Sequence, residues 1–275
     1  MATNWTRTPL IISFPDNPTF NETYGFAGNS GKVNLEGQLL RDPATQSSTV
    51  YVFMHPTSVL HLLPMPLALA DAGLHVLCAA SRYPRNDTAL IFEKVAIDLG
   101  KWLDYARGEL GYEKIVLVGW SGGGSLSLFY QAQAENPTIT QTPARGAADL
   151  TKAGLKPADG VIFIAAHLSR AETMTEWLDP SVIDELNPDN RDPELDIYSP
   201  DCPNKPPFSA AFVARFREAQ RARNRRITNW ALATLARLQA QGGPEQERAF
   251  VVHRTMCDVR WIDLAIDPSD RPLGH

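Results

Sequence analysis

The sequence predicts an α/β protein with a mostly parallel sheet and helices on both of its faces. Apolar runs of strand length alternate with segments of helical periodicity up to Ala166, an order typical of parallel sheets. Several of these runs are continuously apolar, as strands buried on both faces are. The chain has 275 residues, 44% of them hydrophobic, enough for one large α/β domain with an insertion.

The first predicted element is an antiparallel hairpin. Residues 9–14 read as its first strand, turn residues follow, and residues 32–40 alternate between apolar and polar side chains as a half-buried strand does. The elements after the hairpin alternate between buried strand and helix, and we expect them at 50–54, 66–72, 74–80, 92–106, 115–118, 125–130 and 160–166.

Composition divides the chain into three parts. We expect residues 1–169 to form the N-terminal part of the core and residues 170–245 to form an inserted helical cap. The segment 179–201 carries eight acidic residues and one basic residue, whereas 208–241 carries seven arginines and one acid. We expect these arginines to lie on a solvated helix face opposite the acidic stretch. Strand character resumes at Phe250, so residues 246–275 are expected to return to the core as an incomplete end of the sheet.

A G-x-S-x-G motif lies between the predicted strand at 115–118 and the helix that follows it. Its residues are Gly119, Ser121 and Gly123. In this context the chain reverses sharply and lifts the serine clear of the sheet, and a side chain at either glycine would clash. The alternatives are a helix-capping serine or a glycine-rich turn of another α/β fold. A phosphate loop fits less well, because neither the G-x-G-x-x-G spacing nor a Gly-Lys-Ser/Thr sequence is present.

Two backbone N–H groups are candidates for stabilising an oxyanion beside Ser121. One belongs to Gly122, directly after the serine, at the start of a helix. The other belongs to the loop after the strand at 50–54, where Pro56 has no N–H and Thr57 is therefore the expected donor. The alternative is that this loop is an ordinary turn at the end of a strand.

The chain resembles the serine-nucleophile branch of the α/β-hydrolase superfamily. The resemblance covers roughly Leu10 to Ala166 and rests on the hairpin, the sequence 55–57, the loop 82–87 and the motif at 119–123. It departs from the family pattern at Pro56, where glycine is usual. A serine nucleophile excludes the branches that use aspartate, such as haloalkane dehalogenases and epoxide hydrolases.

The resemblance implies a catalytic acid and a catalytic histidine, which follow the serine in the chain. Asp258, after the strand-like residues at 250–252, and His275, the last residue, are the candidates in that order. His167 and Glu172, after the strand at 160–166, are further candidates. The final strand and helix of the family fold are not recognisable, so we expect a C-terminally truncated hydrolase.

The expected function is hydrolysis of a carboxylic ester, or a related acyl bond, through an acyl-enzyme on Ser121. A thioesterase or a carbon–carbon-bond hydrolase is the alternative among enzymes. A catalytically incomplete hydrolase-like protein, with a binding role or none, is the alternative from another class. The expected partner is a small-molecule acyl substrate.

Bulk properties set limits on partners and location. A net charge of −5 argues against binding to nucleic acid or to acidic membranes. No stretch approaches membrane-spanning length, and no signal peptide is recognisable at the N-terminus. Three widely spaced cysteines suggest a reducing compartment, hence a cytoplasmic location. We expect no metal and no cofactor, because His55, His61 and His75 have no second ligand at a metal spacing, and the oligomeric state is open.

Overall fold

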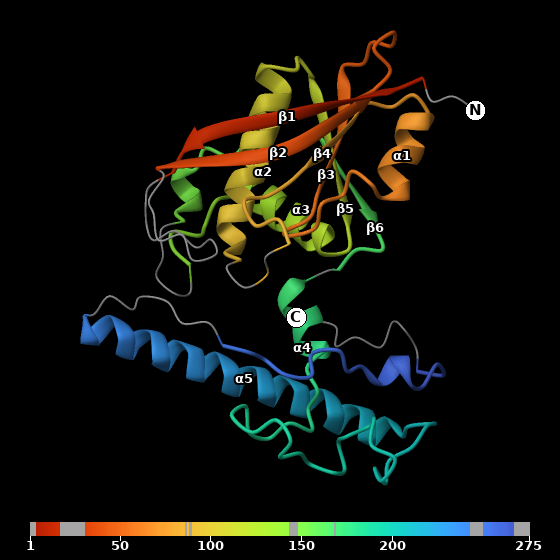
Figure 1. Ribbon diagram of the computed structural model, residues 1–275, viewed down its shortest axis with the longest axis vertical. Helices are drawn as coiled ribbons and strands as arrows, with labels where there is room; N and C mark the ends of the chain where they lie inside the picture. Colours follow the sequence, from red (N-terminus) through yellow and green to blue (C-terminus); the bar gives the residue numbers. More distant parts are fainter. Residues whose placement is uncertain are drawn as a thin grey trace. The chain divides into compact units, whose positions relative to one another are not determined.

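The computed structural model describes residues 4–16, 31–85, 87, 90–142, 148–167, 169–242 and 250–266. The chain divides into two compact units, Met1–Leu168 and Ser169–His275. The first unit contains all the strands in the described part of the chain, and the second is built on one long helix (Figure 1). The boundary between them falls one residue before the predicted end of the core.

A six-stranded mixed sheet forms the first unit. Its order is β1-β2-β4-β3-β5-β6, in which β4, β3, β5 and β6 are parallel and β2 is antiparallel to both of its neighbours. The predicted antiparallel hairpin and the mostly parallel sheet are both confirmed. The strands span Thr6–Pro15 (β1), Lys32–Arg41 (β2), Thr49–Met54 (β3), Val76–Ala79 (β4), Lys114–Trp120 (β5) and Gly160–Ile164 (β6).

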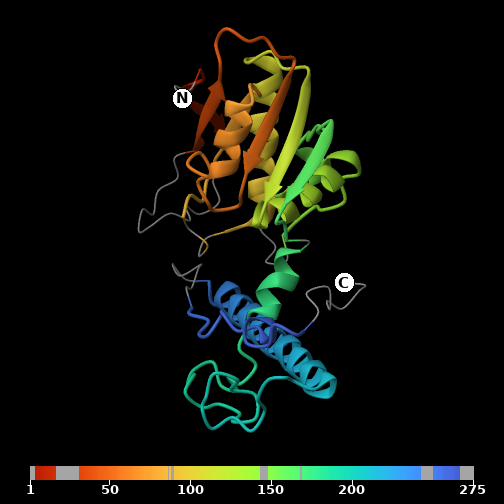
Figure 2. The same ribbon diagram turned by 90° about the vertical axis from the view of Figure 1, so that its right-hand side faces the viewer.

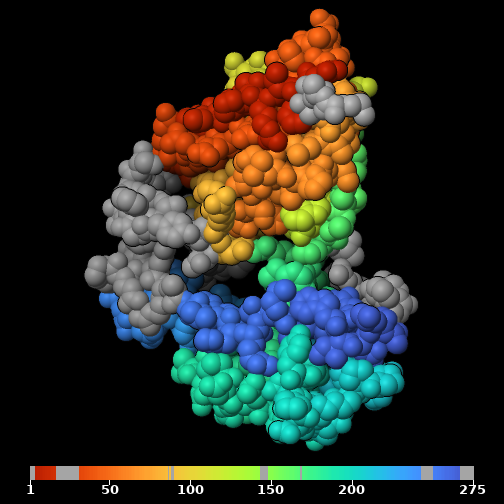
Figure 3. Space-filling model, turned by 45° about the vertical axis from the view of Figure 1, so that its right-hand side comes forward, coloured from red at the N-terminus to blue at the C-terminus, as the bar shows by residue number. Residues whose placement is uncertain are grey.

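Helices cover both faces of this sheet (Figures 1 and 2). On one face, α1 (Pro64–Asp71) packs over a cluster that includes the buried side chain of Phe53. On the other, α2 (Phe92–Gly108) and α3 (Gly122–Glu135) enclose the larger cluster, in which Trp102 and Tyr130 are fully buried. The β1 end is less covered, since β1 lies at the surface in the space-filling view (Figure 3) and Ile11 is 71% exposed.

The order of the strands fixes where a site can form. The chain passes from β3 through α1 to β4 on one side of β3, and then through α2 to β5 on the other side. In open α/β sheets, ligands bind beyond the carboxyl ends of the strands at such a reversal of strand order. The two segments that leave β3 and β5, which begin at His55 and Ser121, therefore lie at the expected place.

The second unit contains α4 (Arg170–Glu176) and α5 (Ala210–Gln241). The single helix α5 carries the arginines noted in the sequence, and several of them pair with the preceding acidic segment as predicted. Arg215 contacts Asp192 and Glu194, and Arg223 contacts Glu185. Two arginines differ from the prediction, because the side chain of Arg223 is fully buried and that of Arg217 is only 8% exposed.

The expectation that the chain returns to the core after residue 246 is not met in the described residues 250–266. They form a single turn of 3₁₀-helix at Val259–Trp261 and no strand, and they belong to the second unit. Cys257 and Val259 are buried in a cluster with Phe216 of α5. The apolar residues that suggested a strand at 250–252 are largely exposed, so their pattern reflected a surface segment beside a helix. None of the helices in the described part of the chain combines the length and apolar character needed to cross a membrane.

Candidate functional site

The turn between β5 and α3 places Ser121 in an unusual backbone conformation. Its φ of 53° and ψ of −125° lie in a region that residues other than glycine rarely adopt. Such a conformation costs on the order of 1–3 kcal/mol and persists only where the surrounding structure holds it. Ser121 stands directly before the first residue of α3, and its side chain does not cap the helix.

Glycines make this turn sterically feasible. A Cβ on Gly119 would lie 2.6 Å from the Cα of Gly124, and one on Gly123 would lie 2.4 Å from the carbonyl oxygen of Met54. A Cβ on Gly124 would in turn lie 2.3 Å from the Cβ of Ala166. These distances confirm the steric prediction for the two motif glycines and extend it to Gly124.

Backbone hydrogen bonds join the turn to the segment after β6. The N–H of Ser121 donates to Ile164 O (3.3 Å), and the N–H of His167 donates to Ser121 O (2.9 Å). The hydroxyls of Ser125 and Ser127 donate to helix carbonyls, as serines within helices often do. Ser125 and Ser127 are buried, whereas Ser121, at the turn itself, is partly exposed.

The N–H of Gly122 is suited to bind an anion beside Ser121. Gly122 is the first residue of α3, so no carbonyl of that helix accepts from its N–H, and the positive end of the helix dipole lies there. The N–H of Thr57, the second predicted donor, is directed elsewhere. It donates to Nδ1 of His55 at 3.1 Å, and the N–H of Ser58 donates to the same atom at 2.9 Å.

The structure brings the imidazole of His55 to this turn, a feature that the sequence analysis missed. Its Nε2 lies 2.8 Å from the position that a Cβ on Gly122 would occupy. The sequence analysis treated His55 as structural because it has no partner at a metal spacing. The available signal was its place as the first residue after β3, since β3 and β5 are adjacent and end at the same edge of the sheet.

The loop that begins at His55 is held by the segment after β4. Ser81 Oγ donates to Pro56 O (2.5 Å), and Arg85 N–H donates to Thr57 O (2.7 Å). Between these two residues, Arg82 pairs with the fully buried Asp98 through both its backbone N–H and its guanidinium. Burial opposes the charge on Arg82, but the carboxylates of Asp98 and Asp16 outweigh it and raise the pKa of Arg82.

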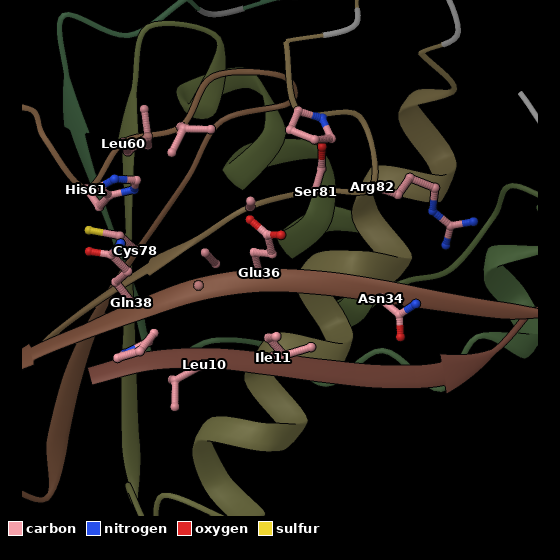
Figure 4. A pocket seen from close by; sticks show the side chains of 16 residues that line it. Leu10, Ile11, Asn34, Glu36, Gln38, Leu60, His61, Cys78, Ser81 and Arg82 are labelled. Atoms are coloured by element: carbon pink, nitrogen blue, oxygen red, sulfur yellow. The ribbon is translucent and has the colours of Figure 1, made fainter. Parts of the chain in front are cut away.

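A cavity of about 320 Å³ lies beside the same segment, over the face of β2 and β4 (Figure 4). Glu36 projects from β2 toward the wall formed by Ser81, and Leu60 and His61 stand at another side (Figure 4). Burial, and then the charges of Arg7 and Arg85, lower the pKa of His61. Its imidazole is therefore favoured in the neutral form at neutral pH.

The predicted acid, Asp258, belongs to the second unit. It is fully buried, its carboxylate accepts from the N–H of Arg260, and it forms ion pairs with Arg217 and Arg260. Burial raises the pKa of this carboxyl, but the two arginines more than compensate and hold it below its usual value. Glu172 lies in the first turn of α4, also in the second unit.

The predicted base, His275, lies outside the described residues. His167 and Glu172 are the two remaining candidates. Of these, His167 lies beside Ser121, because its backbone N–H donates to Ser121 O. Within the part of the chain that the structure describes, no three His, Cys, Asp or Glu side chains form a group that could hold a metal ion.

Comparison with known proteins gives structural similarity at low sequence identity. No protein-family model and no curated protein matches the sequence. Bacterial heroin esterase matches at 14% identity and a TM-score of 0.40, over 65% of this chain and 47% of that one. Brefeldin A esterase, a bacterial homologue of human hormone-sensitive lipase, matches at 16% identity and a TM-score of 0.36, over 49% of this chain and 36% of that one.

A peroxisomal α/β-hydrolase from Saccharomyces cerevisiae matches at 17% identity and a TM-score of 0.35, over 48% of this chain and 42% of that one. The aligned part of these solved structures is therefore less than half of each. The sheet of this chain is consistent with the α/β-hydrolase fold in its strand order and in having β2 antiparallel to both neighbours. The strand–turn–helix at Ser121 is consistent with the same fold.

Proposed function

We propose that this protein is a serine hydrolase that cleaves a carboxylic ester through an acyl-enzyme on Ser121. The observation that carries the proposal is the backbone of Ser121, held at φ 53° and ψ −125° between a buried strand and a helix N-terminus. Strain of this kind is concentrated at functional sites. It matches the nucleophile elbow, whose serine side chain stands above the carboxyl edge of the sheet.

The proposed reaction has two steps. Ser121 Oγ attacks the carbonyl carbon while a base accepts its proton, and the tetrahedral intermediate then expels the alcohol with a proton. Water attacks the acyl-enzyme in the same way, releases the carboxylic acid and restores the hydroxyl. The N–H of Gly122 stabilises the negative oxygen in both steps, because the first turn of α3 directs it toward the developing charge.

A histidine is required as the base, and two candidates follow from the proposal. His275 corresponds to the chain order of the family, with Asp258 as its acid. His167 is favoured by its position shortly after β6, which ends at Ile164, and by the hydrogen bond of its N–H to Ser121 O. Asparagine substitution at each histidine separates them, because loss of the base lowers kcat by several orders of magnitude while leaving stability unchanged.

The test of the nucleophile is labelling by an active-site-directed fluorophosphonate. The wild-type protein should be labelled at Ser121, and Ser121→Ala should not be labelled. Ser127→Ala is the matched control, because its hydroxyl is bonded to Gly123 O within α3 and its loss should leave the labelling rate unchanged. Equal labelling of the wild type and Ser121→Ala would refute the proposal.

The substrate is proposed to be a small-molecule acyl compound, and the location is proposed to be the cytoplasm. The three cysteines support the location, because Cys78, Cys202 and Cys257 are all buried as free thiols.

A panel of p-nitrophenyl esters, acyl thioesters and 1,3-diketones distinguishes an esterase from a thioesterase or a carbon–carbon-bond hydrolase. Absence of turnover on all three, with no labelling, would favour a binding protein with a hydrolase-like fold.

A further inference from the structure

We propose that the imidazole of His55 supplies the second hydrogen bond to the oxyanion, through its Nε2–H group, opposite the N–H of Gly122. The inference rests on the proposed function and names a residue of the same site. It assigns a catalytic contact to a side chain, in place of the backbone N–H of Thr57 that the sequence predicted.

The hydrogen bonds of the loop determine which nitrogen of His55 carries the proton. Nδ1 accepts from two backbone N–H groups, those of Thr57 at 3.1 Å and Ser58 at 2.9 Å. In a neutral imidazole one ring nitrogen accepts and the other donates. An Nδ1 that accepts two hydrogen bonds therefore leaves the proton on Nε2, and a second proton at Nδ1 would oppose both N–H groups.

The position of Nε2 fits an oxygen shared with Gly122. It lies 2.8 Å from the site of a Cβ on Gly122. Since a Cβ stands about 2.5 Å from its own backbone nitrogen, Nε2 lies within about 5.3 Å of that nitrogen. Two donors that each stand about 2.9 Å from one oxygen can be separated by up to about 5.8 Å. The separation of the two nitrogens therefore permits both N–H groups to bind one oxygen.

The loop geometry also explains why Thr57 is replaced in this role. Its N–H is directed into the loop toward His55, and its carbonyl accepts from Arg85 N–H at 2.7 Å. The N–H groups of Thr57 and Ser58 therefore both orient the imidazole of His55. A neutral imidazole oriented by backbone N–H groups is an effective donor to a developing oxyanion, because it needs no reorganisation when the charge forms.

In the reaction, Ser121 Oγ forms a bond to the carbonyl carbon and the carbonyl π electrons move to the oxygen. Nε2–H stabilises that oxygen by a hydrogen bond and keeps its proton throughout. The electrons return when the alcohol leaves. His55 is thus distinct from the base, which must accept the proton of Ser121.

Two substitutions at His55 distinguish a hydrogen bond from its side chain to the substrate from a purely structural role of that side chain in the loop. In His55→Asn, the amide oxygen takes the place of Nδ1 and keeps the two N–H bonds, but nothing reaches the Nε2 position. In His55→Gln, the amide nitrogen reaches the Nε2 position, but the acceptor at Nδ1 is lost. We expect His55→Asn to lower kcat by about 10²–10³-fold with little change in KM, and His55→Gln to retain more of kcat.

The reverse order of the two variants, or equal losses in both, would overturn the inference and identify His55 as a support of the loop. A second readout does not depend on turnover. The ¹⁵N chemical shifts of the His55 ring, assigned by difference with His55→Asn, should report the neutral Nε2–H tautomer at pH 7, and an Nδ1–H tautomer would overturn the inference.

Fluorophosphonate labelling distinguishes failure of the inference about His55 from failure of the proposed function. Labelling of the wild type that slows in His55→Asn supports both claims. Labelling at equal rates in the two proteins removes the role of His55 and leaves Ser121 as the nucleophile. A wild-type protein that neither is labelled nor hydrolyses esters removes the proposed function, and the role of His55 with it.

Discussion

Gly123 packs directly on the last residue of β3, so closely that a Cβ on it would lie 2.4 Å from Met54 O. This contact joins the first turn of α3 to the strand that supplies the loop of His55. The two segments proposed to surround the carbonyl of a substrate are thus fixed to one another through backbone atoms. Their separation cannot adjust to a side chain at this position.

Gly123→Ala should therefore impair both stability and activity. A contact of 2.4 Å with a strand carbonyl forces a backbone shift, and overpacking of this kind costs about 1–3 kcal/mol of the free energy of unfolding. A displacement near 1 Å of the oxyanion site should lower kcat/KM by about 10²-fold. Urea denaturation and ester hydrolysis measure the two effects.

The matched control is Gly108→Ala, at the last residue of α2. A Cβ there meets no atom within 4 Å, so the substitution should be neutral or stabilise the protein by up to about 1 kcal/mol. Equal behaviour of the two alanine variants would show that the close contact at Gly123 does not constrain the turn.

Asp98→Asn should destabilise the first unit strongly. The carboxylate is fully buried and accepts from the backbone and the guanidinium of Arg82, whose side chain is only 11% exposed. Removing one partner of a buried ion pair costs about 3–5 kcal/mol. Asp104→Asn is the control, since its bridge to Lys156 is exposed and such pairs contribute less than about 1 kcal/mol. Similar losses in both variants, measured by urea denaturation, would contradict this account.

The sheet of the first unit could be predicted because its strands are local in sequence and strongly patterned. The continuous apolar runs form strands where the sequence indicated, and β3, β4 and β5 are largely buried as predicted. The predicted burial of the run at 160–166 is wrong, because β6 lies at the edge of the sheet and Phe163 is 49% exposed. The turn at Ser121 was equally predictable, since its glycines leave few alternatives. The antiparallel pairing of β2 with β4 depends on contacts between distant residues, and no local pattern specified it.

The hydrogen bonds of the His55 ring and the structure of residues 250–266 could not be predicted for the same reason. The rotamer of His55 decides whether the N–H of Thr57 faces a substrate or Nδ1 of His55. No sequence pattern specifies that rotamer. The segment 250–252 is apolar enough for a strand, but strand formation needs a neighbouring edge. In the second unit the following residues pack on α5 instead.

Asp258→Asn should reduce the free energy of unfolding of the second unit and flatten its dependence on pH. Arg260 and Arg217 outweigh the effect of burial and hold the folded-state pKa of Asp258 below the unfolded value of about 3.9. The carboxylate therefore stabilises the fold above about pH 4, and this stabilisation is lost as the pH falls through the folded-state pKa. Urea denaturation at pH 7 and pH 3 measures it.

The same variant tests the predicted catalytic role of Asp258. Asp258→Asn that keeps its stability at pH 7 and loses kcat would indicate a catalytic acid. Lowered stability, with normal kcat in the folded fraction, would indicate a structural ion pair. Glu218→Gln is the control, because Glu218 is 58% exposed and its pairs with Arg221 and Arg225 lie at the surface, so stability should not change measurably.

Arg223→Met should release the segment around residue 254 from α5. The guanidinium of Arg223 is fully buried and bonds to Glu185, to Asp179 O and to His253 O, so it links three segments of the second unit. Methionine fills a similar volume but removes these hydrogen bonds and the charge that faces Glu185, and breaking a buried ion pair costs about 3–5 kcal/mol.

Limited trypsin digestion followed by mass spectrometry reports the release, because Arg254 lies within the segment that would detach. Cleavage after Arg254 should be at least tenfold faster in Arg223→Met than in the wild type. Arg225→Met, at a neighbouring position whose side chain is 60% exposed, should be digested there at the wild-type rate. If both variants were cleaved equally fast, the buried guanidinium would not be what holds the segment. The ion pairs of Arg254 with Asp179 and Asp196, together with the packing of Cys257 and Val259 against Phe216, would then account for its attachment.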